Sequence, residues 1–79
     1  MKREVKNPTI GQTCMVYGEN MKIMAVWDGR FLFFGSPIKI IEYWKPALIH
    51  YNIEPRKNGE DKFEVVGISE IDVEYQLPI

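Results

Sequence analysis

Apolar and polar residues alternate over short stretches of this 79-residue chain, and turn-forming residues separate the stretches. In the first half, three segments are rich in the β-branched and aromatic residues typical of strands: 13–17, 21–27 and 31–34. The segments that separate and end them are Gly18-Glu19-Asn20, Asp28-Gly29 and Gly35-Ser36-Pro37. Gly29 can adopt the positive φ that a tight hairpin requires. This pattern predicts a β-meander.

The middle of the chain is harder to interpret. The apolar run 38–44 predicts a fourth strand, and Lys45-Pro46 is expected to stop it, because proline has no N–H to donate to a central ladder. Residues 47–53 are compatible with a strand, a short helix or an ordered loop, and Pro55 ends them.

The C-terminal part predicts a hairpin and a last strand. Asn58-Gly59 is the preferred pair for a type I′ turn, and 62–68 is expected to return as a strand with Gly67 at a bulge or a close contact. Residues 71–77 alternate clearly. We expect one side to face the core (Ile71, Val73, Tyr75 and Leu77) and the other to face water (Asp72, Glu74 and Gln76).

These elements predict a single, mainly β domain over residues 1–79. Six or seven short strands with tight connections favour a small antiparallel barrel or a strongly curved sheet. A barrel would remove exposed edges. The main alternative is one short helix within 38–53.

Composition and charge add little to this picture. Cys14 is the only cysteine, so no intramolecular disulfide is possible, and neither a signal-peptide pattern nor an 18-residue apolar stretch is present. We therefore expect a soluble protein of the cytoplasm. Residues 1–50 carry seven Lys/Arg and four Asp/Glu, whereas residues 51–79 carry three and seven. Most of this asymmetry is expected to be an ordinary solvated surface.

Catalytic chemistry finds little support. Cys14 and His50 could form a thiol–imidazole dyad, but Cys14 lies in an apolar strand pattern, where a thiol behaves as a small hydrophobe. The acidic residues follow no calcium-loop spacing, and the glycines form no phosphate-binding motif. The sequence predicts no catalytic residues, no metal site and no cofactor.

Aromatic and basic residues lie close together along the chain, as in barrels that bind nucleic acids: Trp27, Arg30, Phe31, Tyr43, Trp44, Lys45, His50 and Tyr51. Stacking on bases requires exposed aromatics along a positive groove, and the net charge of −1 does not favour one. Core packing is the expected role of both tryptophans.

Four short motifs resemble a known family. They are Pro8-Thr9-Ile10-Gly11-Gln12, Cys14-Met15-Val16-Tyr17, the segment from Ala25 to Phe31, and the segment from Ile40 to Pro46. Together they are similar to the small domain of unknown function numbered 551, carried largely by phages and prophages. The leading tryptophan of that family is absent here, and residues 47–79 replace its proline-rich tail. The resemblance implies a short β domain encoded by a phage or mobile element, and so a protein of the bacterial host cytoplasm. It supplies no catalytic residues.

The functional expectation is a non-enzymatic phage or prophage accessory protein that binds and inhibits a bacterial host factor, such as a component of a defence system. One alternative is a nucleic-acid-binding or nucleotide-binding barrel, including a sponge for a signalling nucleotide. The other is a structural or assembly protein that oligomerises through unpaired strand edges. The candidate binding residues are Tyr43, Trp44, Lys45, His50, Tyr51, Asp72 and Glu74.

Overall fold

The computed structural model describes residues 3–55, 59 and 61–78, which form eight β-strands and no helix. The strands are β1 (Glu4–Val5), β2 (Thr13–Gly18), β3 (Met21–Trp27), β4 (Phe31–Phe33), β5 (Ser36–Pro37), β6 (Tyr43–Pro55), β7 (Asp61–Glu70) and β8 (Tyr75–Gln76). The prediction of a mainly β chain is confirmed, and the helical alternative for 38–53 is not observed.

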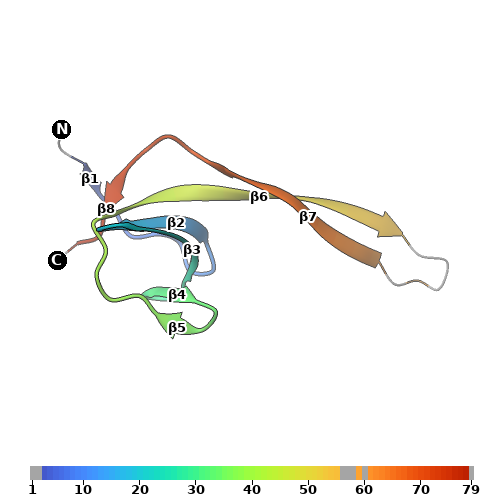
Figure 1. The fold of residues 1–79 in the computed structure, drawn as a ribbon, viewed down its shortest axis with the longest axis horizontal. Coiled ribbons are helices and arrows are strands. Elements are labelled where there is room, and N and C mark those ends of the chain that lie inside the picture. The colour runs from blue at the N-terminus through green and yellow to red at the C-terminus, as the bar shows by residue number, and fades with distance from the viewer. Residues whose placement is uncertain (1–2, 56–58, 60, 79) are drawn as a thin grey trace.

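Seven strands form one curved sheet in the order β1-β8-β6-β2-β3-β4-β5, and β7 pairs with the distal part of β6 (Figure 1). All neighbours are antiparallel except β1 and β8. In the described part of the chain, β1 and β5 end the sheet without pairing to each other, so the sheet is open. A strongly curved sheet therefore describes the fold, and closure into a barrel is not confirmed.

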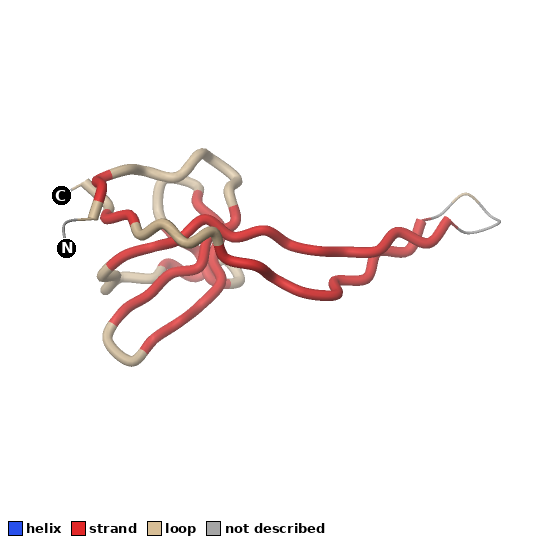
Figure 2. The backbone as a smooth tube through the Cα atoms, turned by 90° about the horizontal axis from the view of Figure 1, so that it is seen from above, coloured by secondary structure: helices blue, strands red, loops and turns tan. Residues whose placement is uncertain are grey.

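The molecule consists of a small body and a long projecting arm (Figures 1 and 2). The body comprises residues 3–46 and 71–78, and the arm is the two-stranded ribbon formed by residues 47–55 of β6 and 61–70 of β7. The principal extents are 51 × 25 × 23 Å, with a radius of gyration of 15.0 Å. A compact chain of this length would have a radius of gyration of about 12 Å. The arm accounts for the difference.

The hydrophobic core lies entirely in the body. Among the described residues, six are buried there: Cys14, Val16, Ala25, Trp27, Phe31 and Trp44. Trp44 lies at its centre, with the ring centroid of Tyr75 at 4.8 Å and that of Phe31 at 6.2 Å. Its indole Nε1 donates a hydrogen bond to the carbonyl oxygen of Lys6 over 3.1 Å. Both tryptophans thus pack in the core, as the sequence predicted.

The three strands of the meander are as predicted, except that the third ends at Phe33 and that Ser36–Pro37, expected to end it, form the short strand β5. β2 pairs along its whole length with residues 21–26 of β3, and Trp27 pairs with Phe31 across the turn that contains Asp28 and Gly29. Gly29 has a φ of 106°, a backbone angle that a residue with a Cβ atom rarely adopts. Of the predicted Asn58-Gly59 turn, only Gly59, with a φ of 81°, lies within the described residues.

The prediction that residues 38–44 form a strand stopped by Lys45-Pro46 is wrong. Residues 38–42 form a connection, and β6 begins at Tyr43 and continues through Pro46 to Pro55. Pro46 is tolerated because it lies at the end of the ladder with β2, opposite Cys14, just before β6 changes its partner to β7. Its carbonyl still accepts a hydrogen bond from the Ile71 amide over 2.9 Å. The ambiguous segment 47–53 is a strand.

The prediction that 71–77 is a strand with four core-facing residues is only partly right. Tyr75 and Leu77 pack against the core, but Ile71 and Val73 are 44% and 39% exposed. Residues 71–74 connect the arm back to the body, and only Tyr75–Gln76 pairs as a strand. Because residues 71–74 are not paired in a ladder, the alternation of apolar and polar residues does not place every second side chain in the core.

Candidate protein-binding surface

One face of the arm is apolar along most of its length. Cross-strand partners point to the same side of a ribbon, and three pairs on one side are Ile49 with Ile68, Tyr51 with Val65, and Ile53 with Phe63. The rings of Tyr51 and Phe63 lie 6.0 Å apart, which places them side by side on this face. We refer to these six residues as the apolar face.

A β-bulge keeps the apolar face continuous. The pairing shifts between His50 and Tyr51, because Tyr51 pairs with Val65 whereas His50 pairs with Gly67. Val66 is the extra residue, so Ile68 stays on the same side as Val65 although they are three positions apart. The bulge predicted near Gly67 is confirmed, and its effect is to align the apolar residues of the two strands.

The opposite face of the arm is largely polar. His50 and Ser69 form a hydrogen bond there, with 2.6 Å between Nε2 and Oγ. The cross-strand pairs nearer the tip are Asn52 with Glu64 and Glu54 with Lys62. Leu48 and Val66 are the apolar exceptions. The arm is therefore amphipathic, and the side chains of its apolar face are all exposed.

The apolar face is exposed to solvent. Its six side chains are 36–64% exposed and present on the order of 600 Å² of surface. The largest apolar patch on a typical monomer is about 300–600 Å² and often has a function. A two-stranded ribbon is also only marginally stable in water by itself. These features mark the apolar face as a surface for a binding partner.

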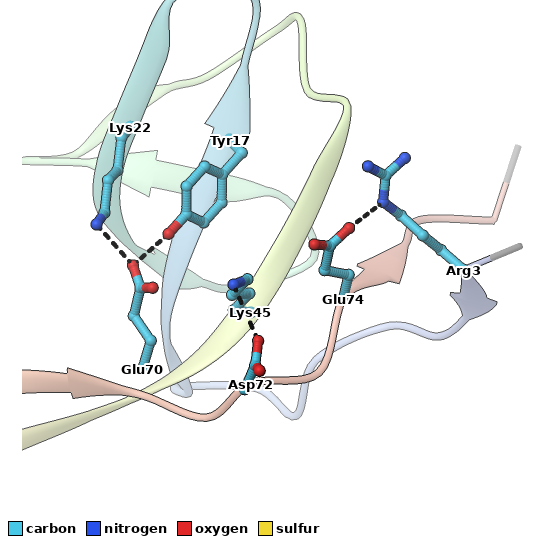
Figure 3. A network of polar contacts seen from close by, with 7 residues as sticks. All are labelled: Arg3, Tyr17, Lys22, Lys45, Glu70, Asp72 and Glu74. Atoms are coloured by element: carbon cyan, nitrogen blue, oxygen red, sulfur yellow. Dashed lines mark hydrogen bonds and ion pairs between the residues drawn. The ribbon is translucent and has the colours of Figure 1, made fainter. Parts of the chain in front are cut away.

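A polar network fixes the base of the arm to the body (Figure 3). The Tyr17 hydroxyl donates a hydrogen bond to Oε1 of Glu70, and Lys22 Nζ lies 3.1 Å from the same oxygen. The ring of Tyr17 stacks on that of Tyr43 at 4.6 Å. Residues of the returning connection form further ion pairs, Lys45 with Asp72 at 3.4 Å and Arg3 with Glu74 at 2.6 Å. These contacts connect the base of the arm, and the connection that follows it, to the meander and to the N-terminal segment.

The network shifts the pKa values of its members. The hydrogen bond from Tyr17, together with Lys22 and Lys45, lowers the pKa of Glu70 despite partial desolvation. Desolvation and the acceptor Glu70 raise the pKa of Tyr17, and the hydrogen bond with Glu70 raises the pKa of Lys22. Glu70 is therefore the carboxylate on which the base of the arm depends.

We expect Glu70→Gln to lower the free energy of unfolding at neutral pH by about 0.5–1 kcal/mol, a figure discounted for solvent screening. Because the pKa of Glu70 is lower in the folded state than in the unfolded state, its contribution is complete above the ordinary pKa of glutamate. It is lost as the pH falls through the folded pKa. The difference between wild type and variant in urea denaturation is thus expected to shrink as the solution is acidified. Glu19→Gln, in the exposed turn between β2 and β3, is the control. A difference that stays constant into acid would contradict this role.

The predicted binding residues lie in three places. His50 and Tyr51 are exposed on opposite faces of the arm, and only Tyr51 belongs to the apolar face. Tyr43, Lys45, Asp72 and Glu74 belong to the network at its base. Trp44 is 1% exposed, so its side chain contacts the core and is not available to a partner. The sequence analysis missed Ile49, Ile53, Phe63, Val65 and Ile68. The period-2 spacing of Ile49, Tyr51 and Ile53 on β6 was a signal, whereas Ile68 joins the apolar face only through the bulge.

The residues considered for catalysis, metal binding and stacking on bases do not come together in one site. Cys14 is buried in the core, and burial raises the pKa of its thiol to about 12, whereas His50 lies on the arm. Among the described residues, no group of three or more His, Cys, Asp or Glu side chains could hold a metal ion. Trp27, Phe31 and Trp44 are buried, which removes three of the aromatics considered for stacking on bases.

A second, smaller apolar patch lies on the body around the β4–β5 turn. Met24, Val26, Phe33 and Phe34 are exposed there and border a hollow of about 320 Å³. Phe34 is 92% exposed and has a φ of 48°, an uncommon conformation for a residue other than glycine. This patch is distinct from the arm and is built on short strands.

Comparisons with known proteins do not identify a relative: no family model, no curated protein and no solved structure matches this chain. The resemblance to the domain of unknown function 551 therefore stays a hypothesis carried by its short motifs. Within the described residues, there is no helix with the length and apolar character needed to cross a membrane.

Proposed function

We propose that this chain is a non-enzymatic protein-binding domain, in which the body holds out the arm so that its apolar face docks on another polypeptide. The observation that carries the proposal is the uncovered row of six apolar side chains on a ribbon anchored at its base. Aromatic and β-branched residues are suited to such a contact because they bury a large area with little loss of side-chain freedom.

The two edges of the arm support the same proposal. Beyond Pro46, β6 pairs only with β7 in the described structure, so the outer edge of each strand is free. Free edges can accept a further strand through main-chain hydrogen bonds, while the apolar face supplies side-chain contacts. A docking segment could use both.

The finer proposal, which derives from the sequence, is that the partner is a bacterial host factor, such as a component of a defence system, and that binding inhibits it. A projecting arm supports this because it can enter a groove of a larger protein while the small body remains outside. The absence of an assembled catalytic constellation in the sequence motivates a role in binding.

Site-specific photo-crosslinking tests the proposed function. Benzoylphenylalanine is introduced in place of Tyr51, on the apolar face, or in place of Asn52, the adjacent residue on the opposite face. In a lysate of the source organism, we expect covalent protein adducts from position 51 at least about ten times more abundant than those from position 52, since only the former is covered on docking. Equal yields at both positions, or none above the unmodified chain, would reject the proposed function.

A further inference from the structure

We propose that the occupant of the apolar face is the same face of a second copy of this chain, so that two arms pack against each other in a twofold dimer. This inference rests on the proposed function, because it uses the same surface, and it specifies a second copy of the chain as the partner in place of the host factor. It also gives a defined interface to the alternative, stated from the sequence, of a structural or assembly protein.

The area of the apolar face is sufficient for a dimer. Because each copy contributes on the order of 600 Å², two faces in contact bury about 1,200 Å², which exceeds the roughly 1,000 Å² expected of a specific interface. A twofold interface uses one patch twice, so no second surface of comparable size is needed. The patch around Phe34 does not need to take part.

The charge distribution permits self-association. None of the six residues of the apolar face is charged, so bringing two copies together creates no like-charge contact at its centre. Glu54, Lys62 and Glu64 take register positions on the opposite face, and the charged Asp61, paired with Pro55, takes one beyond the end of the apolar face, away from its centre. Glu70, at the base, is already engaged by Tyr17 and Lys22. An uncharged face is matched best by another uncharged face.

The shape of the molecule also favours this occupant. The core of the body is small, with six buried residues, and none of its members lies on the arm. Chains of this size bury a modest fraction of their surface when they fold alone. Pairing of two arms would form a second apolar layer shared by the copies, in the manner of two ribbons packed face to face.

Sedimentation or light scattering over a range of concentrations measures the state of the wild-type chain. We expect the mass to rise from the monomer value of 9.3 kDa to twice that value, and no further. Tyr51→Asp places a charge in the middle of the interface and is expected to weaken the dimer at least about 100-fold. Asn52→Asp introduces the same side chain on the opposite face and is expected to leave the dimer intact. Slow labelling of Cys14 by a thiol reagent verifies that each variant remains folded.

The outcomes separate this inference from the proposed function. A wild-type chain that stays monomeric at every concentration overturns the dimer, and the proposed function still stands if position 51 crosslinks to a different protein. A mass that grows beyond two copies also overturns the twofold dimer, because the arm then contacts another surface such as the Phe34 patch in an open chain. Monomeric behaviour without any crosslink at position 51 rejects both.

Discussion

Trp44→Ala is expected to leave a large fraction of the chain unfolded at room temperature. The side chain is 1% exposed, packs against Phe31 and Tyr75, and bonds to the Lys6 carbonyl through its indole N–H. Loss of a buried tryptophan costs about 3–5 kcal/mol through lost burial and the remaining cavity. A small domain has a total stability near the lower end of about 5–15 kcal/mol. The substitution therefore removes most of the stability that is available.

Urea denaturation measures this loss, with the fluorescence of Trp27 as the remaining tryptophan signal. Trp44→Phe keeps an aromatic ring but loses the hydrogen bond, so it is expected to be less destabilising than Trp44→Ala. Ile10→Ala, at a residue that is largely exposed, serves as the control and is expected to change the free energy of unfolding by less than about 0.5 kcal/mol. A Trp44→Ala chain as stable as the control would show that the core is centred elsewhere.

The sequence predicted the meander well because its signals are local. Asp28-Gly29 specifies a tight turn, and the residues on either side pair directly across it. The apolar residues that alternate on β2 and β3 include Cys14, Val16, Ala25 and Trp27, and all four are buried. The turn residues and the spacing of the apolar residues predict the same structure here, and each signal involves residues that are close in the sequence.

Pro46 misled the prediction because its effect depends on which groups surround it. A proline in a central strand removes one donor, and from sequence alone that marks the end of a strand. In the folded chain Pro46 lies where the pairing partner of β6 changes from β2 to β7, so the ladder with β2 and the ladder with β7 are both preserved. The exchange of partners is a property of the tertiary structure and leaves no local sequence pattern.

The arm shows a second limit of sequence patterns. The alternation of Ile49, Tyr51 and Ile53 specifies one apolar side of a strand but does not specify what covers that side. Within this chain the core is complete without them, and the bulge at Val66 aligns them with β7 instead. The same pattern therefore describes a buried strand in one fold and a binding surface in another.

Replacing residues 49–68 by Asn-Gly is expected to leave the body folded and to abolish association. Leu48 and Ser69 are cross-strand partners two steps from the hydrogen-bonded Pro46 and Ile71, which makes them a hydrogen-bonded pair of the ladder too. A two-residue type I′ turn can therefore join them without moving either strand. The core, the Glu70 network and the Pro46–Ile71 hydrogen bond all lie outside the removed segment. The free energy of unfolding of the body is thus expected to change by less than about 1 kcal/mol.

The single cysteine reports the state of the body in this shortened chain. Cys14 is buried and its thiol has a pKa of about 12, so a thiol reagent labels it only when the body opens. Protection of Cys14 equal to that of the full chain, together with a monomeric mass at all concentrations, is the expected result. Rapid labelling would show that the arm is needed to fold the body, and a persistent dimer would show that association uses the body. The arm is an independent binding element only if the shortened chain is both protected at Cys14 and monomeric. Its removal then abolishes association and leaves the fold of the body unchanged.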